Sequence, residues 1–498
     1  MPKPQNVILI MTDNQQAETL GCYGNPEIVT PNLDRLAETG FIFDKAYCPN
    51  AFCSPCRAST LTGLMPSQHG VHAWIDDRNM SEWPAGWHAL NGLSTLPELM
   101  QSAGYRTGLF GKYHLGEPTT PAPGFESWVT MEDGHVRSFY NNRIFDNGQS
   151  YMQPGHSVDF FTDKAIEFIE GCSESQQPFF AYLPYPAPYG HWPATNEPIR
   201  HRFSALYDDC PVNTIPRVGL RPEAVAAYDL VKSRSGGGLD FSMLLRAPND
   251  LPTLRNYYSQ ITLIDDAVGN LVKRLQALGL EQDTLLIFTA DHGLSMGHHG
   301  FWGHGAACWP SNLHQAAHSI PLLVSQPGTV ESGTRSRLHV SNTDLFATIL
   351  DYVGLQAPSA PETPLPSRSL APLLKGEPLV DWGEDEVFSE QEETRVIRTP
   401  QWAYFKRFRG ATQYELSDEL YDVENDPGET NNLLNDPEYT EIGAALAARI
   451  DAFFAANANP QADLWNGGRP LQNTLPRWLW KAAWGEDWAP VYRYSHSE

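Results

Sequence analysis

The sequence has few basic residues and no long apolar run. Its 498 residues hold 34 Lys and Arg against 59 Asp and Glu, which gives a formal net charge of −25. Binding to nucleic-acid phosphates or to an acidic membrane surface requires clustered Lys and Arg, so we expect neither partner. Nowhere do about 18 apolar residues run together, which predicts that the chain has no transmembrane helix.

Cysteine is also scarce, and this scarcity bears on the compartment. The seven cysteines are scattered and odd in number, a usage typical of a reducing compartment rather than of a disulfide scaffold. The apolar run at 7–11 is too short for the core of a secretory signal. We therefore expect a cytoplasmic protein. Cys53 and Cys56 form a CxxC pair, but no second pair follows at the spacing of a zinc site.

Short apolar runs alternate with amphipathic stretches as far as residue 354. Strands are predicted at 6–12, 105–111, 178–185, 284–290 and 320–325. Helices are predicted at 31–40, 94–104, 157–171, 252–279 and 341–354. This alternation predicts an α/β fold, in which helices flank a large, mostly parallel sheet.

The pattern changes after the Pro-rich segment at 357–366. Three short strand-like stretches then follow one another, and a helix is predicted at about 438–455, which together indicate a small antiparallel domain. We predict a catalytic domain at 1–375, an antiparallel subdomain at 376–459 and a Trp-rich extension at 460–498.

The extension carries an unusual series of tryptophans. Trp480, Trp484 and Trp488 recur every four residues, so a helix would place them on one stripe. Two interpretations stay open. The stripe packs onto the protein's own core, or it lies across a neighbouring subunit as an arm, because aromatic anchors dominate interfaces. The second interpretation predicts a homo-oligomer held by the extension.

Two predicted strands end in pairs of residues that commonly bind metals. Asp13-Asn14 follows the strand at 6–12, and Asp291-His292 follows the strand at 284–290. An Asp after a strand is often only a helix cap. Ligands of open α/β sheets bind at the carboxyl ends of the strands, however, so the two pairs together indicate a shared metal. Three oxygen ligands and one imidazole suit Ca²⁺, Mn²⁺ or Mg²⁺.

The segment AFCSPCRASTLTG at 51–63 is the most informative stretch. It leads into a helix that we expect to open at Ala58-Ser59. The free N–H groups and the positive dipole of a helix N-terminus would favour an anionic oxygen on the side chain of Cys53. An inert buried thiol is the ordinary interpretation of a lone Cys, and here the surrounding motif argues against it.

This segment resembles the modification motif Cys-x-Pro-x-Arg, continuing to Thr-Gly, of the formylglycine-dependent sulfatases in the alkaline phosphatase superfamily. Cys56 stands where Ser or Ala is usual. Four further motifs are similar to those of the family: GKYHLG at 111–116, HWP at 191–193, TADHG at 289–293 and ELYDVENDPGETNNL at 419–433. The Asp-His form of the second metal pair is shared with choline sulfatases and phosphonate monoester hydrolases.

The resemblance implies an alkaline-phosphatase-like fold and a set of site residues. Cys53, oxidised to formylglycine, would supply the nucleophile, and Arg57 would stabilise its ionised hydrate. Lys112 and His191 would hold the sulfuryl oxygens, and His114 would remove the remaining proton when sulfate leaves. His304 or Lys112 would protonate the leaving oxygen. The metal ligands would be Asp13, Asn14, modified Cys53, Asp291 and His292, with one divalent ion per subunit, Ca²⁺ first and Mn²⁺ or Mg²⁺ as alternatives.

A second position, besides Cys56, departs from the family pattern. A Lys usually follows the second metal pair, and His304 is our choice for its place, with His314 and His318 as alternatives. The function implied is that of an arylsulfatase-like sulfuric-ester hydrolase acting on a small sulfate monoester and matured by a formylglycine-generating enzyme. The alternatives are a phosphonate monoester or phosphodiester hydrolase with the same site, and a catalytically silent binding protein. An anionic substrate is compatible with the charge of −25 only if cationic groups gather locally.

Overall fold

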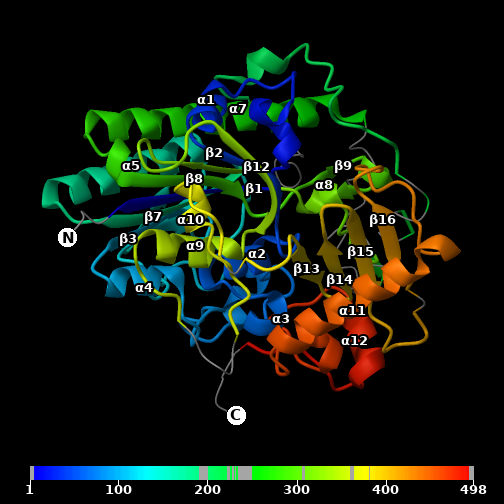
Figure 1. The fold of residues 1–498 in the computed structure, drawn as a ribbon. Coiled ribbons are helices and arrows are strands. Elements are labelled where there is room, and N and C mark those ends of the chain that lie inside the picture. The colour runs from blue at the N-terminus through cyan, green and yellow to red at the C-terminus, as the bar shows by residue number, and fades with distance from the viewer. Residues whose placement is uncertain are drawn as a thin grey trace.

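A ten-stranded sheet covered by helices on both faces forms the main body of the protein (Figure 1). The computed structural model describes residues 5–492 apart from 190–199, most of 221–248, 305–308, 359–363, 381 and 415. A four-stranded antiparallel sheet lies beside the large sheet toward the C-terminus. The predicted α/β fold with a second, antiparallel part is confirmed.

The large sheet is parallel at its centre and antiparallel toward one edge. In spatial order its strands are β12 (Thr334–Ser341), β2 (Phe41–Tyr47), β11 (Leu322–Ser325), β8 (Thr284–Ala290), β1 (Asn6–Asp13), β7 (Phe179–Pro188), β3 (Arg106–Gly111), β4 (Ser127–Met131), β5 (Arg143–Asp146) and β6 (Gln149–Met152). Strand β1 pairs in parallel with both β7 and β8. Strand β11 runs against its two neighbours, and β4, β5 and β6 form an antiparallel meander.

Helices cover both faces of the central strands, which explains why those strands are mostly apolar. Every residue of β1, β7 and β8 is buried. One face packs against α1 (Pro31–Thr39), α5 (Ser157–Ser175) and α7 (Leu251–Ala277). The other packs against α2 (Cys53–Thr62), α4 (Leu96–Ser102) and α9 (Asp344–Tyr352) (Figure 1). Within β1, Ile8 faces the first set of helices and Leu9 the second, as the two-residue period of a strand requires.

The smaller sheet is a meander that carries one long helix. Its strands are β13 (Val387–Gln391), β14 (Thr394–Arg398), β15 (Trp402–Arg407) and β16 (Glu419–Asp422). Helix α11 (Thr440–Asn457) packs on it through Leu446, Ile450 and Phe454. The remaining short elements are α3 (Pro66–His69), β9 (Ser295–Met296), β10 (Trp302–Gly303), α8 (Gln315–His318), α10 (Ala371–Leu374) and α12 (Arg477–Trp484).

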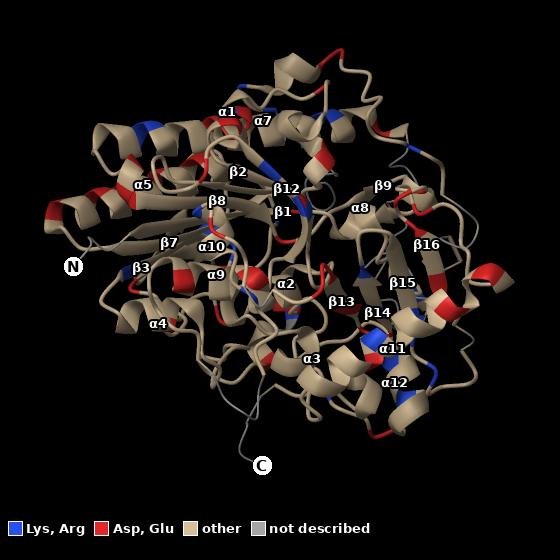
Figure 2. Cartoon of the chain, in the orientation of Figure 1, with Lys and Arg blue, Asp and Glu red and all other residues tan. Residues whose placement is uncertain are grey.

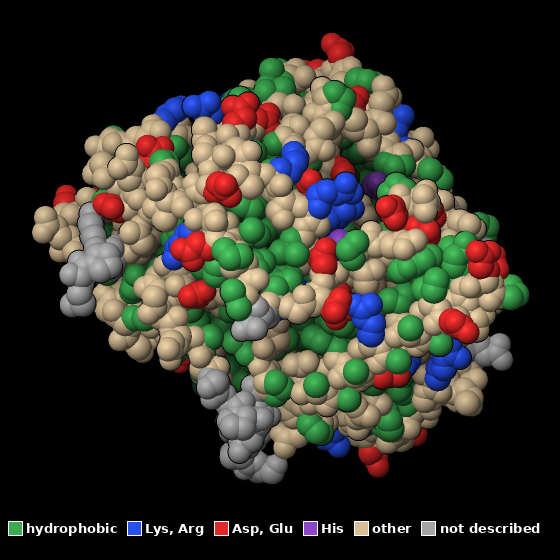
Figure 3. Space-filling view, in the orientation of Figure 1, with side chains coloured by type: hydrophobic (Ala, Val, Ile, Leu, Met, Phe, Trp, Pro, Cys, Tyr) green, Lys and Arg blue, Asp and Glu red, His purple; other side chains and the backbone are tan. Residues whose placement is uncertain are grey.

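Charged residues are spread over both parts of the chain. Figure 2 shows acidic residues on the helices and loops of both parts, and the face in Figure 3 mixes acidic, basic and neutral side chains. Among the described residues, no helix has the length and apolarity needed to cross a membrane.

The C-terminal extension packs on its own chain, but not through a helical stripe of three tryptophans. Helix α12 ends at Trp484, and Gly485 follows with a φ of 105°, so Trp488 lies beyond the helix. The predicted stripe is wrong at this position because the glycine ends the helix. Trp480 and Trp488 are nonetheless buried, and both lie in the hydrophobic cluster formed with Phe408. The predicted arm on a neighbouring subunit stays a prediction.

Hydrogen bonds to Glu392 connect this extension to the smaller sheet and make the stability of the protein depend on pH. The buried carboxylate, at the turn between β13 and β14, accepts hydrogen bonds from Leu475 N, Thr474 Oγ1 and Trp480 Nε1. Burial, followed by the nearby Glu393 charge, raises the pKa of Glu392 from 4.5 to about 8. Because its pKa is higher in the folded than in the unfolded chain, Glu392 makes its full contribution to the free energy of unfolding below pH ~4.5. This contribution is lost as the pH rises through about 8.

Glu392→Gln should therefore flatten the pH dependence of stability. We expect the wild type to lose about 4 kcal/mol more unfolding free energy than the variant between pH 5 and pH 9, since each unit of pKa shift is worth about 1.4 kcal/mol. Urea unfolding followed by Trp fluorescence measures this difference. Glu441→Gln, at an exposed position of α11, is the control. Parallel profiles for wild type and Glu392→Gln would contradict the prediction.

Candidate active site

The pairing of β1 with β8 brings together the two predicted metal pairs. The strands run in parallel with Thr12 opposite Ala290, so Asp13 and Asp291 leave the sheet side by side. The backbone N–H of Asp291 donates to Thr12 O at 2.9 Å. The N–H of Asn14 donates to Asp291 Oδ1 at 3.2 Å. The carboxyl edge of the sheet thus gathers residues that are 277 positions apart in sequence.

Cys53 is the first residue of helix α2, so the predicted helix start at Ala58 is wrong. The helix opens five residues earlier because Pro55 lies in its first turn, where a missing N–H costs nothing. Asn50 supports the start by accepting from Phe52 N at 2.9 Å. All ten residues of α2 are buried. The positive end of the helix is therefore at Cys53 itself, whose Sγ lies 3.7 Å from Asp13 Oδ1 and 3.4 Å from His292 Nε2.

Two buried cations lie against the two carboxylates. Arg57, one helical turn after Cys53, donates to Asp13 Oδ2 at 3.0 Å and to Asp291 Oδ2 at 2.8 Å. Its second terminal nitrogen donates to Lys112 O at 2.7 Å. The Lys112 ammonium lies 2.6 Å from Asp13 Oδ2. These four side chains are fully buried. Two cationic side chains therefore lie at the site, where they balance the charges of the two carboxylates.

The buried charges stabilise one another in their ionised forms. Burial alone would raise the pKa of Asp291, but His292, Arg57 and Lys112 hold it below its usual range. Burial alone would lower the pKa of Lys112. The charge of the Asp13 carboxylate has the larger opposite effect, so the pKa of Lys112 is raised. For Cys53, burial and then the Asp13 charge raise the thiol pKa well above its usual range. The unmodified side chain is therefore a neutral thiol, which is a weak nucleophile.

The donor set fits a divalent cation. Ligand atoms of Asp13, Cys53, Asp291 and His292 all lie within 4.8 Å of one another. Beside them, the side-chain amide of Asn14 is buried, and neither Oδ1 nor Nδ2 has a hydrogen-bond partner among the residues that the structure describes. A buried acceptor without a partner costs about 1–3 kcal/mol, and a metal on Oδ1 would remove this cost for the amide oxygen. Carboxylate and amide oxygens are the ligands of hard cations such as Ca²⁺.

His114 presents one free ring nitrogen to the site. Its Nε2 lies 3.0 Å from Ile75 O, and because a carbonyl only accepts, this nitrogen carries the proton. Its Nδ1 is buried and, among the described residues, accepts no hydrogen bond. Burial, and then the Lys112 charge, lower the pKa of His114 well below its usual range. The neutral imidazole can therefore accept a proton. A nitrogen of this ring lies within 4.8 Å of Cys53 Sγ.

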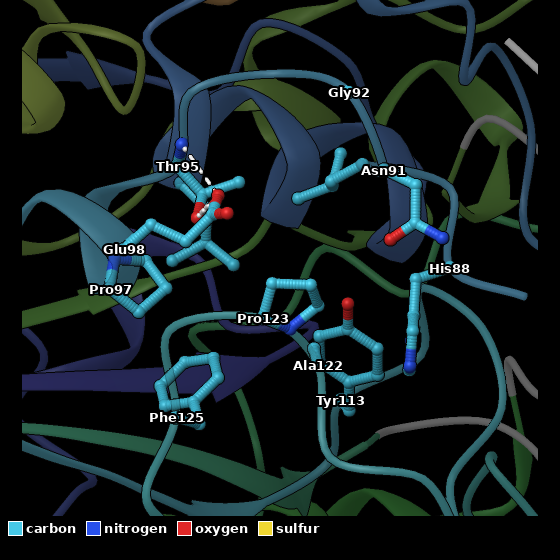
Figure 4. Close-up of a pocket in the computed structure, with 12 residues that line it drawn as sticks. His88, Asn91, Gly92, Thr95, Pro97, Glu98, Tyr113, Ala122, Pro123 and Phe125 are labelled. Carbon is cyan, nitrogen blue, oxygen red and sulfur yellow. Dashed lines mark hydrogen bonds between the residues drawn. The ribbon is translucent and has the colours of Figure 1, made fainter. Parts of the chain in front are cut away.

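Tyr113, between Lys112 and His114, faces away from this site. It lines a separate cavity of about 130 Å³. In Figure 4 the phenol points into that cavity beside Pro123, with His88 and Asn91 on one side. The hydrogen bond between Thr95 and Glu98, which caps α4, lies across the cavity (Figure 4). Successive side chains of an extended segment point in opposite directions, so residues 112–114 contribute both to the active site and to the separate cavity.

The structure separates the three histidines proposed to replace the family lysine. The His304 ring lies 4.5 Å from the His292 ring and meets Phe52 edge-on at 5.7 Å. His314 instead lies 3.2 Å from Glu429 in the C-terminal motif, and His318 Nδ1 lies 3.1 Å from Cys48 O. Of the three, His304 is placed against a predicted metal ligand. His191 lies outside the described residues, and its role stays a prediction.

Two side chains at this site were not found from the sequence. Tyr189 directly follows β7, and its N–H donates to Asp13 O at 3.1 Å. His135 comes from the turn after β4, and its ring lies 4.8 Å from that of His114. Tyr189 could have been suspected, because it follows a predicted strand at the same edge as Asp13. His135 follows a strand that the sequence did not predict, so no signal pointed to it.

The profile of the sulfatase family matches residues 5–355, which is most of the chain. The chain belongs to the sulfatase family. The resemblance of the sequence motifs is thereby confirmed, and the protein is a sulfuric-ester hydrolase by family. A second profile, described as the C-terminal part of N-sulphoglucosamine sulphohydrolase, matches residues 308–455 of this sulfatase.

Curated relatives cover most of the sulfatase at low identity. An N-acetylglucosamine-6-O-sulfatase of Bacteroides thetaiotaomicron is 25% identical, over 88% of this chain and 84% of its own. The human N-sulphoglucosamine sulphohydrolase is 28% identical, over 88% of each chain. A solved structure described as a complex with its substrate D-glucosamine-2-N,6-O-disulfate superposes with a TM-score of 0.72 at 23% identity, covering 91% of this chain and 98% of its own. The phosphonate monoester hydrolase of Agrobacterium radiobacter superposes with a TM-score of 0.67 at 21% identity, covering 91% and 95%. Both superpositions show the shared fold.

Proposed function

We propose that this sulfatase removes a sulfate group from a sulfated glucosamine, with formylglycine at residue 53 and one divalent cation, Ca²⁺ by preference. The main observation in support of this reaction is the position of Cys53. It is the first residue of a buried helix, and its Sγ lies near Asp13 and His292, one from each predicted metal pair. Arg57, one helical turn later, pairs with the carboxylate of Asp291. The substrate class is supported by the relatives, two of which are named for glucosamine sulfates. We prefer this class to the aryl sulfates of the sequence-based hypothesis.

Each residue of the site has its own role in the proposed reaction. When present, the cation and the formylglycine hydrate would supply charge neutralisation and a hydroxyl nucleophile. Asp13, Asn14, Asp291 and His292 would hold the cation. Arg57 lies close enough to stabilise negative charge at residue 53, and the Lys112 ammonium would hold a sulfuryl oxygen. His114 Nδ1 would accept a proton from residue 53, and His304 or Lys112 would donate one to the leaving oxygen. His191 is retained as a further sulfuryl ligand.

Maturation has to precede folding. Cys53 is 3% exposed, on a helix that is buried throughout, so a formylglycine-generating enzyme could not reach it in the native protein. We propose that this partner acts on the unfolded chain. We also propose a reducing, cytoplasmic compartment, a proposal supported by the six described cysteines, all of which are free thiols. We further propose that the protein forms a homo-oligomer through its C-terminal extension, as the sequence predicts.

Two measurements test the proposed function. Mass spectrometry of the peptide that contains residue 53 should show the loss of mass that accompanies conversion of a thiol to an aldehyde. The rate of hydrolysis should then be greater for N-acetylglucosamine-6-sulfate or glucosamine-2-N-sulfate, measured as sulfate release, than for an aryl sulfate, a phosphonate monoester or a phosphodiester, measured as release of the alcohol or phenol. Preference for the phosphorus esters would favour the phosphonate hydrolase alternative instead. An unmodified Cys53 together with no turnover of any ester would favour the silent binding protein.

A further inference from the structure

His135 and Tyr189 form a pair beside Lys112 and His114 for which the proposed reaction has no role. His135 Nε2 lies 3.1 Å from Tyr189 Oη, and the two rings meet edge-on with centroids 5.4 Å apart. The other ring nitrogen of His135 lies 3.2 Å from Val136 O. Because this carbonyl only accepts, Nδ1 carries the proton and Nε2 accepts from the tyrosine hydroxyl. Both nitrogens of His135 are therefore engaged.

Tyr189 in turn holds Lys112. The Lys112 ammonium lies over the tyrosine ring, 5.2 Å from its centre, a distance at which a cation is attracted by the aromatic face. The backbone of Tyr189 is tied to Asp13 by the hydrogen bond between its N–H and Asp13 O. Asp13 is also the carboxylate that pairs with Lys112. The lysine is thus held between a carboxylate on β1 and the phenol that follows β7.

His135 also lies close to His114, the proposed base, and to Cys53, the proposed site of the nucleophile. Its ring lies at 70° to that of His114. Nitrogen atoms of these two rings and Cys53 Sγ all lie within 4.8 Å of one another. The turn that carries His135 is anchored two residues later, where Arg137 pairs with the mostly buried carboxylate of Asp77. The ion pair of Arg137 and the hydrogen bond to Tyr189 thus hold the turn and the ring of His135 beside the site.

We propose that His135 is a positioning residue of the sulfatase reaction. It fixes the Tyr189 hydroxyl and thereby the aromatic face under Lys112, and it limits the rotation of His114. The inference rests on the proposed function, since it assigns His135 a role in that reaction. A second metal on Cys53, His114 and His135 is not favoured, because both ring nitrogens of His135 are already engaged in hydrogen bonds.

The test is a double-mutant cycle on His135 and Tyr189, measured as sulfate release. We expect His135→Ala and Tyr189→Phe each to lower kcat/KM by 10- to 100-fold, mainly through kcat, with melting temperatures close to the wild type. If His135 acts through the tyrosine hydroxyl, the double variant should be at most threefold slower than the slower single variant. His135→Gln, which keeps an acceptor, should restore at least a third of the activity. His339→Ala removes a buried histidine of β12 that contacts Asp385, and it should leave kcat/KM within threefold.

A binding measurement gives a readout that needs no turnover. In the Cys53→Ala background, calorimetry with inorganic sulfate should show 5- to 20-fold weaker binding after His135→Ala, because Lys112 is no longer held. The proposal is overturned if His135→Ala matches the wild type in both assays, or if the losses of the two single variants multiply. If the wild type itself releases no sulfate from any ester, the proposed function fails, and the role of His135 in it fails with it.

Discussion

Cys53→Ala should abolish sulfate ester hydrolysis, with kcat/KM falling by roughly 10⁴- to 10⁶-fold, as expected when a catalytic nucleophile is removed. The thiol makes only weak hydrogen bonds, since a thiol is a weak donor and acceptor and Sγ lies 3.4 Å from His292 Nε2 and 3.7 Å from Asp13 Oδ1. Loss of this group should therefore leave the fold and the melting temperature nearly unchanged. Initial rates of sulfate release, measured beside thermal melts, separate the two effects.

Cys56 provides the matched control for this experiment. It lies on the same helix, is fully buried, and accepts a hydrogen bond from Asn342 Nδ2 at 3.1 Å. Cys56→Ala should cost some stability and keep kcat/KM within about tenfold, because Cys56 points toward the core rather than to the two carboxylates. Sulfate release by Cys53→Ala at a rate near that of Cys56→Ala would show that residue 53 is not the nucleophile.

Asp13→Asn should remove both the metal site and most of the stability of the charge cluster. Asp13 pairs with Arg57 and with Lys112, and breaking a buried pair on one side costs about 3–5 kcal/mol. We expect a large fall in melting temperature and a loss of kcat/KM of more than about 10³-fold. Chelation of the wild type should likewise abolish activity, and added Ca²⁺ should restore it.

The control for Asp13→Asn is another buried aspartate. Asp344 accepts hydrogen bonds from Ser341 N and Arg368 N at 2.9 Å each, at the start of α9. Asp344→Asn should lower the melting temperature and leave the affinity for Ca²⁺, measured by calorimetry, unchanged. If Asp13→Asn binds Ca²⁺ as the wild type does, the assignment of Asp13 as a metal ligand is wrong. If only the melting temperature changes and kcat/KM is preserved, its catalytic assignment is wrong as well.

The parts of the fold that the sequence predicted well are those in which one local rule dominates. Strand β8 occupies the predicted residues, and β1 is one residue longer than predicted, because a fully buried parallel strand requires a continuous apolar run. The antiparallel edge strands β5 and β6 are short and partly exposed, and they gave no such signal. Helix α2 begins at Cys53 rather than at the predicted Ala58, since Pro55 fits within the first turn of a helix.

Within the site, the sequence by itself determined the residues that occur in motifs. Cys53, Arg57, Lys112 and His114, together with the two pairs that follow β1 and β8, were all found from short segments of chain. Their chemistry is local, since a strand end or a helix start presents the side chain directly. The tertiary structure decided which of them share one charge cluster, and that Arg57 neutralises both carboxylates.

Only the tertiary structure could decide the residues that act through others. His135 and Tyr189 meet because the turn after β4 and the end of β7 come together in space, a contact set by strand order rather than by any spacing in the sequence. Tertiary contacts also separate His304 from His314, since the His304 ring lies beside His292 and Glu429 of the C-terminal motif contacts His314. The sequence specifies which groups are available, and long-range packing decides which of them lie within reach of the same atom.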